Sequence, residues 1–76
     1  MSLAEAPKDT VLKVVFIDSG DETKRKLSAM GIHLDNEVVK IHNPKWGPIL
    51  IKHVEAGASK LAIGRRIAEK IKVTYE

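Results

Sequence analysis

Short runs of apolar, largely β-branched residues recur along this chain between polar, glycine and proline breaks, a pattern typical of β-strands joined by turns. The segment from Val11 to Ile17 is the clearest case, because it is dense in β-branched and aromatic residues. Both of its faces are apolar: Leu12, Val14 and Phe16 share one, and Val11, Val15 and Ile17 share the other. We therefore expect a first strand that is covered on both sides.

Four further strands are predicted. The segments Asn36 to His42 and Ile49 to Val54 form a hairpin, because the two prolines and the glycine of the intervening loop 43–48 cannot continue a ladder. Gly57 breaks the chain before a short strand from Lys60 to Ile63. The last strand runs from Lys72 to Tyr75. The lead-in before the first strand ends in a turn at residues 7–9.

Two helices interrupt the strands. Ser19 and Glu22 have the Ser-x-x-Glu spacing of a capping box, which predicts a helix start. A helix of about three turns would place Thr23, Leu27 and Met30 on one face. Gly31 is the expected stop, because glycine reaches positive φ without a Cβ clash. A second, shorter helix covers residues 65–70, with Ile67 and Ala68 facing inward.

Five short strands and two helices with short connections predict a mainly β fold. Seventy-six residues suffice for one small domain, which we assign to residues 1–76. Closing a strongly bent sheet into a barrel removes exposed strand edges. The sequence therefore favours a small barrel of about five strands.

Composition narrows the function. The chain has no cysteine, which excludes disulfides, thiolate catalysis and cysteine-ligated zinc and suits a reducing cytoplasm. The longest apolar run, Val14 to Ile17, is far shorter than the roughly 20 residues that span a bilayer, so we expect no membrane insertion. The first residues also lack a signal-peptide pattern, and we expect a cytoplasmic protein. A net charge of +3 permits an acidic partner, but one Trp, one Tyr and one Phe do not indicate a nucleic-acid binder.

Catalytic and metal-ligating patterns are weak. There is no P-loop and no G-x-S-x-G elbow, and the acidic cluster Asp18, Asp21 and Glu22 complements a helix dipole, so no enzyme is expected. His33, His42 and His53 match no compact ligand motif. His42 and His53 lie on paired strands and can meet across the hairpin, where imidazoles would hold a labile transition metal such as Fe2+. Ordinary surface histidines are the alternative.

Two surface features are candidates for binding a partner. Lys24, Arg25 and Lys26 are consecutive and fan around the first helix, either as a solvated face or as a binding patch. Trp46, between the prolines of the hairpin loop, is either an exposed anchor for a partner or a lid folded over the barrel.

Several of these segments, in this order, resemble the FeoA family of small proteins of bacterial ferrous iron uptake. The resemblance rests on Leu27-Ser28-Ala29-Met30-Gly31-Ile32, which matches L-x-x-M-G-hydrophobic, on Gly47-Pro48-Ile49, and on Leu61 to Arg66. It implies an SH3-like barrel. The family usually has glycine where this chain has Asp35-Asn36, and commonly near Asp9. We expect these turns to survive, because Asp and Asn tolerate the left-handed region.

The resemblance also implies a role. FeoA-like proteins are cytoplasmic accessories of FeoB, a membrane iron transporter with a GTP-hydrolysing domain, which would be bound from its cytosolic side. The partner-binding residues we expect are Trp46, Lys24, Lys26 and Asp35. The alternative is a metal-responsive regulatory domain that binds a transition metal directly, as the similar barrels of iron-dependent repressors suggest.

Overall fold

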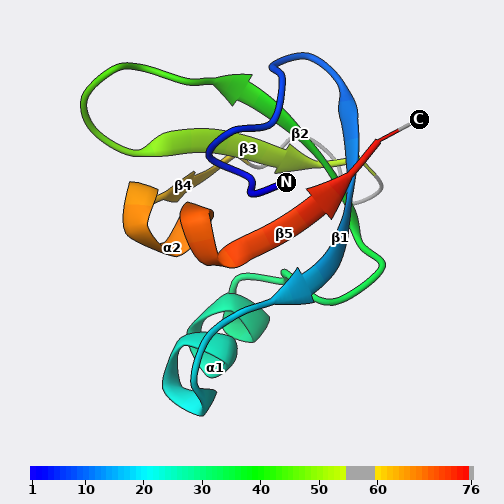
Figure 1. Ribbon diagram of the computed structural model, residues 1–76, viewed down its shortest axis with the longest axis vertical. Helices are drawn as coiled ribbons and strands as arrows, with labels where there is room; N and C mark the ends of the chain where they lie inside the picture. The colour runs from blue at the N-terminus through cyan, green and yellow to red at the C-terminus, as the bar shows by residue number, and fades with distance from the viewer. Residues whose placement is uncertain (55–59, 76) are drawn as a thin grey trace.

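The computed structural model describes residues 1–54 and 60–75, which form one antiparallel sheet and two short helices (Figure 1). The strands follow the order β4-β3-β2-β1-β5 across the sheet. In chain order the elements are β1 (Val11–Ile17), α1 (Asp21–Ala29), β2 (Glu37–His42), β3 (Ile49–His53), β4 (Lys60–Ile63), α2 (Arg65–Lys70) and β5 (Ile71–Thr74).

The N-terminal segment covers the outer edge of β5. Ser2 forms a bridge with Lys72, and the Leu3 amide donates to the Ile71 carbonyl at 2.7 Å. The Val73 amide donates to the Met1 carbonyl at 2.8 Å. An unpaired strand edge is a template for aggregation. Since β1 pairs with only one edge of β5, the N-terminal segment protects the other edge. The chain thereby gains a short sixth segment of extended pairing that the sequence pattern did not predict.

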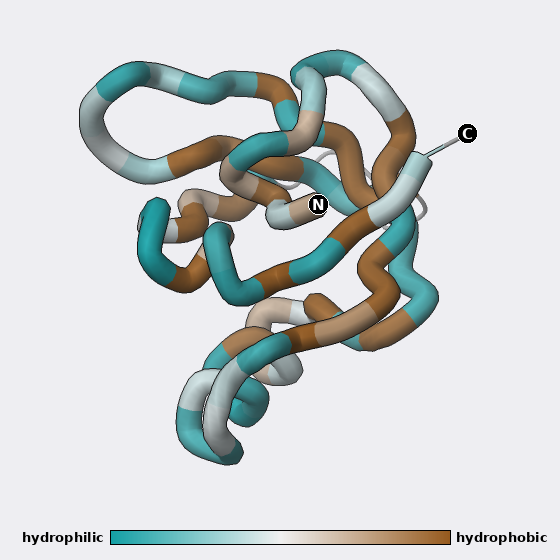
Figure 2. The backbone as a smooth tube through the Cα atoms, viewed as in Figure 1, coloured by the Kyte–Doolittle hydropathy of each residue, from teal (hydrophilic) through white to brown (hydrophobic). Residues whose placement is uncertain are grey.

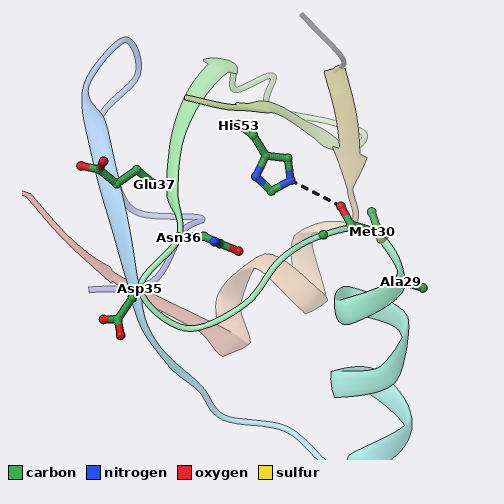
Figure 3. A pocket seen from close by; sticks show the side chains of 7 residues that line it. Ala29, Met30, Asp35, Asn36, Glu37 and His53 are labelled. Carbon is green, nitrogen blue, oxygen red and sulfur yellow. Dashed lines mark hydrogen bonds between the residues drawn. The ribbon is translucent and has the colours of Figure 1, made fainter. Parts of the chain in front are cut away.

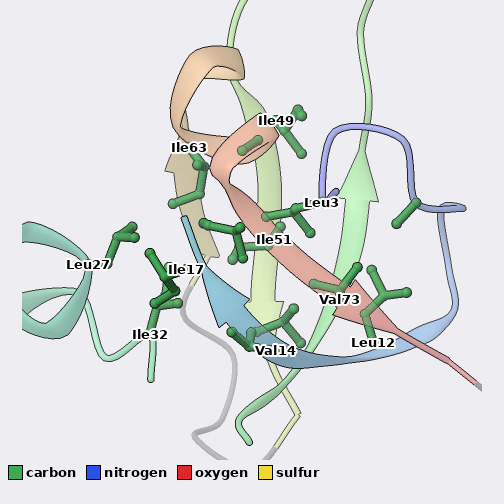
Figure 4. Packing of buried hydrophobic residues seen from close by; sticks show 14 residues of the cluster. Leu3, Leu12, Val14, Ile17, Leu27, Ile32, Ile49, Ile51, Ile63 and Val73 are labelled. Atoms are coloured by element: carbon green, nitrogen blue, oxygen red, sulfur yellow. The ribbon is translucent and has the colours of Figure 1, made fainter. Parts of the chain in front are cut away.

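The core lies inside the curve of the sheet, and apolar and polar stretches alternate along the strands that surround it (Figure 2). Figure 4 shows that side chains from β1, β3, β4, β5 and α1 point into one cluster. Its buried members are Leu3, Ala6, Leu12, Val14, Ile17, Leu27, Ile32, Val38, Ile49, Ile51, Ile63, Ala68, Ile71 and Val73. The mainly β prediction is confirmed, and the described residues form the predicted five strands and two helices.

A bulge in β1 overturns one expectation. Leu12 and Val14 are buried, but the pairing with β5 shifts register between Val14 and Phe16, and the next inward residue is Ile17. Phe16, expected to share a covered face with Leu12 and Val14, is 53% exposed, and Val15 is also exposed. The prediction of a first strand covered on both faces is therefore wrong, because one extra residue in a bulge changes which side chains point inward.

The predicted capping box is also wrong. Helix α1 begins at Asp21 with Gly20 as its N-cap, and no side chain caps it. The reciprocal pattern occurs instead in the lead-in, where the Ser2 amide donates to Glu5 Oε1 at 3.1 Å and the Glu5 amide donates to Ser2 Oγ at 3.2 Å. The hydrogen bond from the Ser2 amide to the carboxylate is the main cause that lowers the pKa of Glu5. The same Ser-x-x-Glu spacing thus occurs twice in the chain, and it forms the reciprocal hydrogen bonds at Ser2 but not at Ser19.

The end of α1 is a Schellman motif around Gly31. The Ile32 amide donates to the Leu27 carbonyl at 2.8 Å, and the Gly31 amide donates to the Ser28 carbonyl at 2.9 Å. Gly31 has φ of 82°, the left-handed conformation that the sequence predicted for it. Leu27 and Ile32 are both buried, so the motif also makes its expected hydrophobic contact. The L-x-x-M-G-hydrophobic signature is therefore the sequence of a helix end that turns into the core.

Replacing Gly31 with alanine should lower the free energy of unfolding by about 1–2 kcal/mol, because an L residue is strained at positive φ. The new Cβ would also lie 3.3 Å from His53 Nε2, a tight contact. Urea unfolding measures the effect. Gly47 is the matched control, since its φ is 89° and nothing lies within 4 Å of an added Cβ. A Gly31→Ala variant no less stable than Gly47→Ala would contradict a role for the His53 contact.

The remaining boundaries and turns agree closely with the sequence pattern. β2 begins one residue later than predicted, β3 ends one residue earlier, and β5 is displaced by one residue toward the N-terminus. Asp9 and Asp35 adopt φ of 59° and 69°, which confirms that aspartate occupies the left-handed region at both turns. The predicted break at Gly57 lies outside the described residues.

Candidate partner interface

Trp46 lies at the tip of the β2–β3 hairpin and is 87% exposed. Loop 43–48 extends away from the barrel (Figure 1), and Arg65 Nη2 at the start of α2 donates to Asn43 Oδ1 at 3.3 Å. Gly47 reverses the chain with positive φ directly after the tryptophan. The alternative of a lid over the core is wrong, because the indole covers almost nothing in its own domain.

The exposed side of α1 presents Lys24, Arg25 and Lys26 to solvent. Leu27 is the only buried residue of this helix, which is otherwise mostly hydrophilic (Figure 2). Beside the helix lies a groove of about 250 Å³, which we call the α1 groove. It is lined by Phe16, Ile17, Lys24, Ser28, Ile32, His33 and Leu34.

Asp35 lies in the turn between α1 and β2. Its amide donates to the Val14 carbonyl at 2.7 Å, which extends the pairing of β1 with the chain before β2. The carboxylate is exposed and lies 3.8 Å from Lys13 Nζ, an arrangement that contributes little in water. The His33 amide donates to Asn36 Oδ1 at 2.6 Å, so the turn is held by its own side chains. Asp35 is therefore a fixed, accessible anion next to the end of α1.

A second cleft, of about 440 Å³, lies on the other side of this turn (Figure 3). His53 points into it, with Nε2 3.4 Å from the Met30 carbonyl oxygen. The carboxylates of Asp35 and Glu37 point away from the imidazole in Figure 3. Within residues 1–54 and 60–75, no three His, Asp or Glu side chains are grouped so that they could hold a metal ion.

His42 and His53 do not meet across the hairpin, so the possibility of a metal site between them is wrong. His53 pairs with Val38 and His42 with Leu50, so the two histidines lie at opposite ends of the β2–β3 ladder. His42 lies four positions along β2 from Val38, the partner of His53, which corresponds to a separation of roughly 13 Å. The sequence could not fix the hairpin register, and the register decides whether two strand histidines become neighbours.

Lys40, in β2, is a polar residue that the sequence analysis missed. It is fully buried, and its Nζ donates to the Ala6 carbonyl at 2.6 Å and to the Ala4 carbonyl at 3.1 Å. Burial lowers its pKa below the usual 10.5, and the nearby Arg65 charge adds to this. The signal was available, since Lys40 shares the inward face of β2 with Val38.

The predicted partner-binding residues form two separate regions. Lys24 lines the α1 groove beside Leu34, the neighbour of Asp35, and Lys26 is exposed on the same helix. The Trp46 loop lies toward the other end of the molecule's long axis (Figure 1). The structure therefore brings Lys24 close to the Asp35 turn and leaves Trp46 apart.

Comparisons with known proteins identify the family and the fold of this chain. The family model described as FeoA domain matches residues 1–75. A crystal structure of an iron uptake regulatory protein (FeoA) has 27% sequence identity and a TM-score of 0.84, over 96% of this chain and 93% of that chain. No match was found among curated proteins. Among the described residues, no helix combines the length and apolar character needed to cross a membrane.

Two further structures share the fold. FeoA of Stenotrophomonas maltophilia, solved with zinc and described as a prokaryotic SH3 domain protein, has 24% identity and a TM-score of 0.77, over 97% of this chain and 89% of that chain. The manganese regulator SloR has 10% identity and a TM-score of 0.85, but this chain spans only 34% of it. The SH3-like fold predicted from the sequence is confirmed.

Proposed function

The chain belongs to the FeoA domain family, which is implicated in ferrous iron transport, and from this premise we propose that it is a non-enzymatic accessory protein of iron uptake. It acts in the cytoplasm by binding the cytosolic side of a FeoB-like membrane transporter and adjusting its GTPase-containing region. A relative described as an iron uptake regulatory protein and another described as a possible transport-activating factor support this role.

The observation that carries the proposal is the exposure of Trp46. A side chain of this size is normally buried in part, and here 87% of it contacts solvent. Tryptophan is enriched among the residues that dominate binding energy in protein interfaces. The loop around it is constrained by Pro44, Pro48 and the hydrogen bond from Arg65, so little conformational entropy is lost on binding.

Lys24, Lys26 and Asp35 supply charged contacts in the second region, which consists of α1 and the turn that follows it. Lys24 and Lys26 project from α1 and would attract acidic groups of the transporter, mainly by raising the association rate. Asp35 is an exposed anion on a fixed turn and would accept a hydrogen bond or pair with a cation. These three residues therefore orient the complex, while Trp46 supplies affinity.

Replacing Trp46 with alanine should weaken binding to the cytosolic region of the transporter by about 30-fold, as truncation of an interface hot spot typically costs ~2 kcal/mol. Calorimetric titration of the purified proteins measures this. Lys45→Ala is the matched control, because Lys45 is exposed in the same loop. Unchanged affinity in the Trp46→Ala variant would remove Trp46 from the interface.

The alternative of a domain that responds to metal directly receives less support. Its candidate ligands His42 and His53 lie at opposite ends of a hairpin. The likeness to the barrel of SloR concerns the fold alone. A titration with Fe2+ that moved the imidazole signals of both histidines together would favour this alternative over the accessory role.

A further inference from the structure

We propose that the α1 groove is a docking site for an acidic segment of the transporter's cytosolic region, one that carries large apolar side chains. This inference rests on the proposed function and assigns a specific surface and partner chemistry to it. The groove would be a second contact with the transporter, apart from the one at Trp46. Its walls come from the end of β1, the side of α1 and the turn that follows the helix (Figure 1).

The first argument is the apolar surface of the groove. Phe16 and Leu34 are 53% and 56% exposed, and both line it. Between them the groove reaches Ile17 and Ile32, which belong to the buried core. Two large exposed apolar side chains that share one groove with the core mark an interaction site better than scattered single residues do.

The second argument is charge. Lys24 is the only lining residue with a full charge, and His33 is the only other titratable one. Arg25 and Lys26 follow on the same helix, and Asp21 and Glu22 lie in its first turn, but none of these four residues lines the groove. A partner segment with carboxylates beside its apolar side chains would therefore be attracted.

Another cleft of the molecule is lined by charges of both signs, unlike the α1 groove. The cleft beside Val11 and Tyr75 also contains exposed large apolar side chains. It is lined by both Lys13 and Glu37, so a cation and an anion offset each other there. The α1 groove has no carboxylate among its lining residues, and a preference for an acidic occupant follows.

The third argument is size. A volume of about 250 Å³ is below the range of roughly 300–1,000 Å³ that is typical of small-molecule sites. It fits one or two large side chains of a protein partner, as when an apolar face of a segment lies in a groove. The Schellman motif fixes the groove beforehand, because it sets the position of Ile32 and of the turn that carries Leu34.

The test compares matched variants for binding to the purified cytosolic region of the transporter and to short overlapping peptides that span it. Phe16→Ser combined with Leu34→Ser should weaken binding by about 30-fold, whereas Val15→Ser, at an exposed site outside the groove, should change it less than ~2-fold. Lys24→Glu should weaken binding by about 5- to 10-fold, and Arg25→Glu, the same charge change beside the groove, by much less.

The outcomes separate this inference from the proposed function. Loss of binding in the groove variants, with an acidic, apolar peptide as the segment bound, supports both. Groove variants that bind like the wild-type protein, while Trp46→Ala binds weakly, overturn the docking site and leave the accessory role intact. A wild-type protein that binds no part of the cytosolic region overturns both. Self-association that disappears in the Phe16→Ser variant would assign the groove to a second copy of this chain and also overturn the docking site.

Discussion

Replacing Lys40 with alanine should lower the free energy of unfolding by about 3–5 kcal/mol and leave only a marginally stable domain. The lysine lies inside the barrel, and its ammonium group donates hydrogen bonds to two carbonyls of the lead-in, those of Ala4 and Ala6. Its removal leaves these acceptors without a donor and creates a cavity where the side chain had packed.

The consequence extends beyond one side chain, because Lys40 connects two parts of the barrel. Its Nζ binds the turn that follows Ser2, and Ser2 and Leu3 pair with the edge of β5. The Lys40 carbonyl also accepts from the Asp9 amide at 2.9 Å. We therefore expect the Lys40→Ala variant to lose amide-exchange protection first in the lead-in and at β5.

A methionine at this position separates the hydrogen bonds from the packing. Lys40→Met keeps most of the volume and removes the donor, and it should cost about 1–3 kcal/mol in urea unfolding. A Lys40→Met variant as stable as the wild-type protein would show that the buried charge costs as much as its hydrogen bonds contribute.

The pH dependence follows from the lowered pKa of Lys40, which is 10.5 when unperturbed. Between the lowered folded-state value and 10.5 the unfolded chain binds more protons at Lys40, so the folded state gains stability as the pH rises through this window. Below this pH window Lys40 is protonated in both the folded and the unfolded state, so the folded state bears the full free-energy cost of burying the ammonium group. The stability of the wild-type protein relative to Lys40→Met should therefore increase as the pH is raised toward 10.5.

Replacing Leu27 with alanine should cost about 2–5 kcal/mol, the usual range for removing a buried leucine side chain. Leu27 is 1% exposed and is the only buried residue of α1. A helix of nine residues is not stable alone in water, so α1 depends on this contact. Its carbonyl also accepts the Ile32 amide in the Schellman motif.

The Leu27→Ala variant should therefore release α1 and disrupt the α1 groove, while the Trp46 loop keeps its structure. Urea unfolding gives the stability, and amide exchange shows where protection is lost. Thr23→Ala is the control, because Thr23 lies on the same helix face and is only half-buried. Equal losses of stability in the two variants would contradict the role of Leu27 as the anchor of the helix.

The sequence predicted the elements well where a strong local pattern decides the structure. β1, β4 and α2 have the predicted bounds, and the β-branched run of β1 is the strongest of these local patterns. Gly31 ends α1 with positive φ, and the aspartates at 9 and 35 occupy the left-handed region. The family resemblance, rather than periodicity, supplied the SH3-like topology.

The sequence failed where pairing between distant segments decides the structure. The bulge in β1 depends on its register with β5, and it is this bulge that exposes Phe16 and so creates one wall of the α1 groove. The burial of Lys40 depends on carbonyls 34 and 36 residues away. Trp46 was ambiguous because the loop sequence does not specify whether a hairpin tip folds back or extends.

An amide NMR titration of the isotope-labelled chain with the cytosolic region of a FeoB-like transporter tests the central claim most directly. The accessory role predicts shifts in loop 43–48, in α1 and in the turn around Leu34 and Asp35, with few changes along β3 and β4. An unchanged spectrum at partner concentrations far above those of typical specific complexes would contradict binding to this region and therefore the proposed function.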